Sequence, residues 1–292
     1  MLAGLLGALV IAFSAILVRL AEVSPSTAAF FRCAYAVPLL AVLAWMERRR
    51  HGPQAPRDRM LAFGAGAIFA ADLIFWNYSI EAVGAGLATV LGNLQVVLVA
   101  LLAWAALGER PAPRTLVSIP IALTGVVLIS GVIGSGAYGE DPLLGVVYGV
   151  LTAIAYALFL LILRQAGSSD RPPAGPLFDA TLSAAVFCAI AGVAIGDIDW
   201  VPEAESQAWL VLLALSSQVL GWMLISVSLP RLPAALTSIV LMVQPATSVV
   251  LGVVLLDEAP SAVQLSGVAI VLGAVGFATL GARAREPVPQ SA

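Results

Sequence analysis

Apolar runs of about twenty residues follow one another along almost the whole chain. As a helix, each is long enough to cross the roughly 30 Å hydrocarbon core of a bilayer. We predict ten such spans, separated by polar or Gly/Pro-rich joints, at residues 2–20, 27–46, 60–79, 84–107, 114–132, 143–163, 177–196, 207–228, 234–256 and 262–281. The composition agrees, because only 11% of the residues are charged, whereas about 25% is usual in a soluble domain. The sequence therefore predicts an all-α membrane protein with ten transmembrane helices.

The arginines indicate how these spans are oriented, because short cytoplasmic loops carry the excess of basic residues. The sequence contains no Lys. If the N-terminus is inside, the cytoplasmic side holds twelve arginines: Arg48, Arg49, Arg50, Arg57, Arg59, Arg110, Arg114, Arg164, Arg171, Arg231, Arg283 and Arg285. Arg19 then faces outward, and Arg32 lies within a span. We therefore predict that both termini are cytoplasmic.

The same composition argues against several classes of function. An ATP-binding P-loop needs a Lys, and a net charge of −3 gives no reason to expect a nucleic-acid partner. His51, the only histidine, lies in an arginine-rich loop, so a histidine-based intramembrane enzyme is disfavoured. Cys33 and Cys188 lie inside apolar runs and form neither a disulfide framework nor a metal-site pattern. We therefore predict no metal and no cofactor.

Similar sequences at the end of a predicted helix occur twice, 149 residues apart. Residues 94–111 read LQVVLVALLAWAALGERP, and residues 243–260 read VQPATSVVLGVVLLDEAP. The polar matches are Gln95 with Gln244 and Glu109 with Glu258. Five spans separate the copies, and because five is odd, the second copy enters the membrane from the opposite side. We predict two inverted five-helix repeats, at 1–132 and 143–282, with a periplasmic linker at 133–142 and a cytoplasmic tail at 283–292. Such repeats are typical of secondary transporters that bind substrate near the midplane.

These residues also carry a family resemblance. The segments LGERPAPRTLVSIPIALTGVVLI (107–129) and LDEAPSAVQLSGVAIVLGAVGFA (256–278), with Arg32 in AAFFRCAYAVPLL, resemble the EamA family of the drug/metabolite transporter superfamily. The resemblance implies a monomeric carrier in the bacterial inner membrane that exports small metabolites, amino acids including aromatic ones, by alternating access. It also implies a cavity bordered by spans one, three, four, six, eight and nine. One departure is Gln95-Val96, where such proteins often carry a Pro, so we expect a weaker kink in span four than at Gln244-Pro245 in span nine.

Polar and aromatic side chains near mid-depth are the candidates for lining that cavity, because polar groups in a membrane usually face a cavity or a partner. The predicted cavity residues are Ser14, Trp76, Asn77, Tyr78, Asn93, Gln95, Tyr148, Thr152, Tyr156, Gln218, Trp222 and Gln244. Interhelical hydrogen bonding is the alternative explanation for each of them. Amide, hydroxyl and aromatic groups together suit a small zwitterion or another polar metabolite with an apolar portion.

Arg32 and Asp72 are the charged candidates, and two interpretations of them stay open. Counting along the helices places both about 8–10 Å from the outer ends of their spans, so they are at the right depth to form a buried ion pair. Asp72 is otherwise a proton-coupling carboxylate. The alternative functions are a proton-coupled exporter of drugs or toxic compounds and an uptake permease for another small polar metabolite. Residues 1–18 hold no acid, which argues against the first-helix glutamate used by small relatives in the superfamily.

Overall fold

The computed structural model describes residues 2–108, 110–166, 172–228 and 234–279. Glu109 and the arginines at 171, 231, 283 and 285 lie outside these ranges. The described residues are all-helical, as predicted. Seven of their helical segments are long and apolar enough to cross a bilayer, and three further apolar helices lie at Pro113–Ile129, Met242–Leu255 and Ala262–Ala278. Together they make up the ten predicted spans.

The first five spans comprise eight helices, because three spans are interrupted. Span one is α1 (Leu2–Ala12) with α2 (Ser14–Ala21), and span two is α3 (Pro25–Ala34) with α4 (Val37–His51). Span three is the long helix α5 (Pro56–Val83). Span four is α6 (Ala85–Gly92) with α7 (Gln95–Leu107), and span five is α8 (Pro113–Ile129).

The second five spans contain one irregular helix. Spans six and seven are α9 (Pro142–Ala166) and α10 (Ala174–Ile195). Span eight starts as α11 (Ala204–Leu213), continues as the π-helix η1 (Ala214–Gly221) and ends as α12 (Trp222–Ser228). Spans nine and ten are α13 (Ala234–Leu255) and α14 (Ala262–Thr279).

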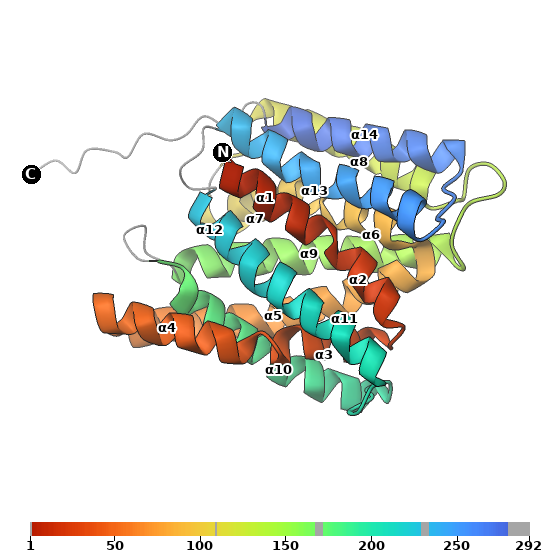
Figure 1. The fold of residues 1–292 in the computed structure, drawn as a ribbon. Helices are drawn as coiled ribbons and strands as arrows, with labels where there is room; N and C mark the ends of the chain where they lie inside the picture. The colour runs from red at the N-terminus through yellow and green to blue at the C-terminus, as the bar shows by residue number, and fades with distance from the viewer. Residues whose placement is uncertain (1, 109, 167–171, 229–233, 280–292) are drawn as a thin grey trace, which may run out of the picture.

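Helices of the two repeats pack on one another in matched pairs. Helix α8 lies beside α14, α6 beside α13, and α10 beside α3 and α4, so that each of these spans contacts its own repeat mate (Figure 1). The crossed contacts are matched as well. Span three packs on span six (α5 on α9), and its repeat mate, span eight, packs on span one (α1 and α2). Span four packs on span six, and its repeat mate, span nine, packs on span one (α13 on α1). The repeats are therefore interlocked through their full length rather than placed side by side as separate domains.

The two ends of the bundle are distinguished by their connections. One end, called the linker end here, carries residues 22–24, 130–141, 196–203 and 256–261. The opposite end, called the N-terminal end, carries the start of α1 and the end of α4, and it lies at the left of Figure 1.

The repeated helix ending forms a left-handed turn followed by a glutamate. Gly108 and Asp257 occupy equivalent positions in the two repeats, and both have positive φ, +69° and +52°. A residue of this conformation commonly ends a helix, because it lets the chain leave the axis while the last carbonyls stay bonded. The backbone N–H of Glu258 accordingly donates to the Gly252 carbonyl at 3.1 Å.

Glu258 then joins the two repeats at the linker end. Its carboxylate, 3% exposed, accepts hydrogen bonds from the backbone N–H of Ala85 (2.5 Å) and of Gly86 (3.1 Å) at the start of α6. The first amides of a helix have no partner within the helix and carry partial positive charge. Gly252 leaves the room for this contact, since a Cβ there would lie 2.3 Å from the carboxylate. Glu258 therefore caps α6 from the end of α13.

The expected weaker kink in span four is wrong. Span four is broken between α6 and α7, whereas α13 continues through Pro245. At the break, the side-chain Nδ2 and the backbone N–H of Asn93 both donate to the Thr89 carbonyl, at 2.9 and 3.2 Å. The following amides make i to i−3 bonds, such as Leu94 N–H to Leu91 O at 3.0 Å, which tighten the chain out of the α-helix.

We expect Glu258→Ala to lower thermal stability, because it leaves two buried amides of α6 without an acceptor. Each unsatisfied buried group costs about 1–3 kcal/mol. Thermal unfolding of the detergent-purified protein measures the loss, and Glu258→Gln, which keeps one carbonyl acceptor, should fall between Ala and wild type. Glu140→Ala, exposed at the same end, is the matched control. A Tm equal to that of wild type in Glu258→Ala would mean that the cap contributes nothing.

Candidate functional site

A small cavity lies at the middle of the bundle, where spans of both repeats meet. Its volume is about 50 Å³, which is room for a few water molecules at about 10–15 Å³ each. Its walls come from spans one, two, three, four, six, eight and nine. The lining residues are Ile11, Ser14, Arg32, Phe69, Asp72, Leu73, Trp76, Thr89, Gly92, Asn93, Thr152, Tyr156, Trp222 and Gln244.

Two of the three helix interruptions in the first repeat, and the π-helix of span eight, lie at this cavity. Ile11 and Ser14 flank the break between α1 and α2, Gly92 and Asn93 lie at the break between α6 and α7, and Trp222 follows η1. Discontinuous membrane helices are typical of transporter binding sites, because irregular backbone is tolerated at membrane depth only where protein or a cavity satisfies it. The backbone irregularities and the polar side chains thus mark the same place.

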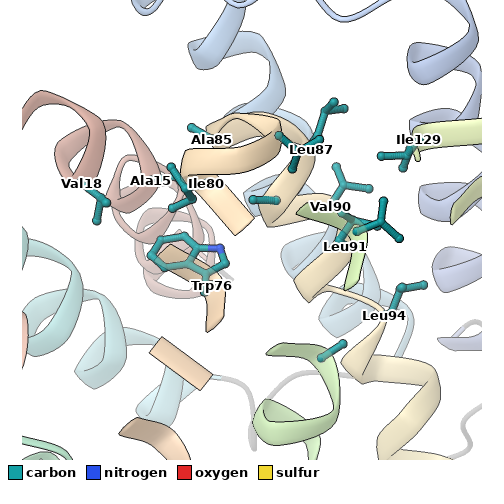
Figure 2. Packing of buried hydrophobic residues seen from close by; sticks show 14 of the residues in the cluster. Ala15, Val18, Trp76, Ile80, Ala85, Leu87, Val90, Leu91, Leu94 and Ile129 are labelled. Carbon is teal, nitrogen blue, oxygen red and sulfur yellow. The ribbon is translucent and has the colours of Figure 1, made fainter. Parts of the chain in front are cut away.

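Toward the linker end, an apolar cluster closes the bundle. Figure 2 shows Trp76 and Ile80 of α5 gathered with Ala15 and Val18 of α2, and Leu87 further along α6. All of these side chains are buried, and Trp76 belongs both to this cluster and to the cavity wall. In this conformation, the packed cluster and the Glu258 cap separate the cavity from the linker end.

The cavity brings together nine of the fourteen side chains singled out from the sequence. These nine are Ser14, Arg32, Asp72, Trp76, Asn93, Thr152, Tyr156, Trp222 and Gln244. They come from seven different spans, so their proximity could not be read from sequence spacing.

The other five predicted residues lie outside the cavity wall. Asn77 donates to the Pro25 carbonyl at 2.9 Å, and the Tyr78 hydroxyl donates to Asp197 at 2.9 Å. Tyr148 stacks on Tyr78 with ring centroids 5.2 Å apart. Asn77, Tyr78 and Gln218 make hydrogen bonds to other segments, which was the alternative explanation from the sequence. Gln95 is buried at the start of α7, and Gln218 contacts Arg32.

The lining residues missed by the sequence reasoning are mostly apolar or small: Ile11, Phe69, Leu73, Thr89 and Gly92. Polarity gives no signal for four of them. Helical spacing gives a signal for two, because Phe69 and Leu73 lie on the same face of α5 as Asp72 and Trp76.

Arg32 and Asp72 both face the cavity but do not form the predicted ion pair. Both residues are described, and no guanidinium nitrogen of Arg32 comes within the 4.0 Å salt-bridge distance of an Asp72 carboxylate oxygen. Arg32 instead donates from Nε to Gln218 Oε1 at 3.0 Å, and its guanidinium lies 5.5 Å from the centre of the Trp76 ring. The cavity therefore holds one basic and one acidic side chain that are not in direct contact with each other.

Aromatic rings form the wall beside Asp72. The Trp222 ring makes edge contacts with Tyr156 and Phe69, with centroids 6.1 and 5.9 Å apart. Trp222 Nε1 is a buried donor without a hydrogen-bond partner in the described part of the chain. An anionic carboxylate next to aromatic faces is suited to an ammonium group, since both attract a cation.

A second hollow, of about 210 Å³, lies at the N-terminal end between α4 and the starts of α5 and α10. It is larger than the central cavity, but both of its carboxylates already have partners. Asp179 forms a salt bridge with Arg59 at 3.1 Å, and Glu47 accepts from the Gly175 N–H at 3.1 Å. Asp179 of α10 thus pairs with Arg59 of α5. We take the central cavity as the candidate site because spans of both repeats line it and its arginine and aspartate form no direct ion pair.

Known proteins resemble the chain over nearly its whole length. A family model described as the EamA-like transporter family matches residues 1–131 and 143–280. No curated protein matches the chain. A solved crystal structure of another protein superposes with a TM-score of 0.64, at 17% identity and with 96% of each chain covered. At that identity the likeness concerns the fold alone.

A double-mutant cycle tests the separation of the two charges. Removing one member of a direct buried pair costs about 3–5 kcal/mol, and removing the second recovers much of it. Without direct contact, we expect the coupling between Arg32→Gln and Asp72→Asn to stay clearly below the about 3–5 kcal/mol of a direct buried pair. Recovery of most of the loss in the double variant would show that the pair forms after all.

Proposed function

We propose that this chain, which belongs to the EamA-like transporter family, is a secondary carrier that exports small zwitterionic metabolites, above all amino acids, by alternating access. The family consists of transporters, so the chain is a multi-pass membrane transporter of small solutes. The finer proposal rests on one observation, the unpaired opposite charges of Arg32 and Asp72 in a single cavity.

An amino acid complements this cavity group by group. Its carboxylate suits the planar guanidinium of Arg32, which offers several N–H donors. Its ammonium suits Asp72 and the neighbouring faces of Tyr156 and Trp222. The apolar wall accepts a hydrophobic side chain, including an aromatic one. Because the cavity now has a volume of only about 50 Å³, it has to widen before such a substrate fits.

The inverted repeats supply the mechanism of access. In the conformation described, the apolar cluster and the Glu258 cap close the linker end. Opening that end requires α6 and α13 to separate, which breaks the two hydrogen bonds between Glu258 and the start of α6. The arginine distribution supports a cytoplasmic N-terminal end, so the closed side in this structure is the periplasmic side of a bacterial inner membrane. We take the carrier to be a monomer.

A proton-coupled exporter of cationic compounds is the second candidate. Asp72 favours it, because within the described residues this cavity carboxylate has no basic side chain at salt-bridge distance. An unpaired, desolvated carboxylate is the kind of group that exchanges protons with a gradient. Under this alternative, Arg32 does not touch the substrate.

Three probes that differ by one charged group separate these candidates in proteoliposomes: phenylalanine, phenethylamine without the carboxylate, and 3-phenylpropionate without the ammonium. We expect Arg32→Gln to raise the KM about tenfold or more for phenylalanine and phenylpropionate, since a charge-assisted contact is lost. Asp72→Asn should do the same for phenylalanine and phenethylamine.

Tyr148→Phe, outside the cavity, is the matched control and should leave all three KM values unchanged. A uniform loss for the three probes in both variants would contradict a zwitterion site. Amine uptake that responds to ΔpH in wild type and loses that response in Asp72→Asn would favour the proton-coupled alternative.

The orientation is tested by thiol labelling in intact cells. The two native cysteines, Cys33 and Cys188, are fully buried, so wild type gives a low background. We expect Glu205→Cys, exposed at the linker end, to react with an impermeant thiol reagent, and Arg57→Cys, exposed at the N-terminal end, to react only after lysis. The reverse pattern would place the termini outside.

A further inference from the structure

We infer that Gln218 is a positioning residue that holds the Arg32 guanidinium ready for a substrate carboxylate and keeps it away from Asp72. This inference rests on the proposed zwitterion site. It assigns a role to a side chain that does not line the cavity, through its contact with one that does.

Gln218 ties Arg32 to a third helix. Its Oε1 accepts from Arg32 Nε at 3.0 Å, and its Nε2 donates to Thr181 Oγ1 of α10 at 3.1 Å. Gln218 and Thr181 are fully buried, and Arg32 is 5% exposed. Arginine has no acceptor atom, so the amide oxygen has to face Arg32, and the amide nitrogen then faces Thr181. The side chain of Gln218 is thereby fixed at both ends.

The bond to Nε determines which part of the guanidinium remains available. Nε lies at the stem side of the group, so the two terminal Nη nitrogens stay free to meet a carboxylate. The Trp76 ring, 5.5 Å from the guanidinium carbon, lies against the same group. An arginine side chain is otherwise long and flexible. Without Gln218, the nearest compensation for its charge in this cavity is Asp72, and a direct pair would remove both charges from the substrate.

The backbone of span eight is irregular at this residue. Gln218 lies in the π-helix η1, and Trp222, four residues later, lines the cavity. A π-helix contains i to i+5 hydrogen bonds, is rare, and is found frequently at functional sites. Gly221 lets this wider segment pack closely on α1, since a Cβ there would lie 2.5 Å from Ile11. The local geometry thus presents Gln218 to Arg32 and Trp222 to the cavity from one short segment.

A purely structural role for Gln218 makes a different prediction. Interhelical hydrogen bonds of buried amides stabilise membrane bundles modestly, and losing such a bond affects every substrate alike. A positioning role affects substrates through Arg32, so its loss depends on whether Arg32 is present.

Transport of phenylalanine and phenethylamine by four proteins tests the inference: wild type, Gln218→Met, Arg32→Gln, and the double variant. Methionine fills a similar volume without an acceptor for Arg32. We expect Gln218→Met to raise the KM of both probes about tenfold, because Arg32 turns to Asp72 and each charge neutralises the other. Adding Arg32→Gln should restore the phenethylamine KM to that of Arg32→Gln alone, since Asp72 is free again, and should leave phenylalanine transport impaired.

Controls separate this effect from general damage. Gln207→Met removes a glutamine from the same span whose partners are Tyr35 and Pro202, and it should leave both KM values unchanged. Thr181→Val removes only the second anchor of Gln218 and should raise the phenylalanine KM by a smaller factor, while Thr181→Ser should behave as wild type. If Gln218→Met does not purify as a folded protein, the Thr181 pair carries the test.

Two results would overturn the inference while the proposed function stands. In one, Gln218→Met and Thr181→Val transport phenylalanine with the wild-type KM. In the other, phenethylamine transport falls in Gln218→Met and stays low in the double variant, which makes Gln218 a packing residue. If wild type takes neither probe, the proposed function itself fails, and the role of Gln218 fails with it.

Discussion

The hydrocarbon core of a membrane offers no water, so every backbone amide and every charge at that depth needs a partner from the protein. The same requirement holds for backbone groups that the protein itself buries at the linker end. Gly84 ends α5 and α6 begins at once, which leaves the first amides of α6 buried. Glu258 supplies the acceptor from the other repeat. The same contact therefore satisfies a helix end and fastens α6 to α13.

The constraint applies equally to ionised side chains, and the structure meets it in two ways. Arg59 and Asp179, near the N-terminal end, form a direct salt bridge. Arg32, at mid-depth, is held by the neutral Gln218 and the face of Trp76 instead. A neutral partner satisfies a hydrogen-bond donor without cancelling the charge. Arg32 in the central cavity therefore has no carboxylate in direct contact, whereas Asp179 in the other hollow has a direct ion pair with Arg59.

The irregular stretches of helix follow from the cavity as well. Regular helices bury their own polar backbone and present only side chains to their neighbours. The breaks at Phe13 and Asn93 and the π-helix at Gln218 interrupt the regular α-helical backbone, and they lie around the central cavity. The cavity and the irregular backbone thus lie in one region, while α8 and α14 are continuous helices without a break.

The sequence by itself determined the class of fold, the ten spans and the inverted repeat. The spans follow from the length and hydrophobicity of local segments. The inversion follows from the odd number of spans in each repeat. Neither depends on which helices pack together. It also pointed to nine of the cavity residues, because polarity at membrane depth is rare. Only the tertiary structure decided the partners. Arg32 and Asp72 have matching depths, yet Gln218 from a distant span takes the guanidinium. The helix break fell at Asn93, and α13 continued through Pro245. Partner choice depends on which side chains meet across helices, and spacing along one chain does not fix that.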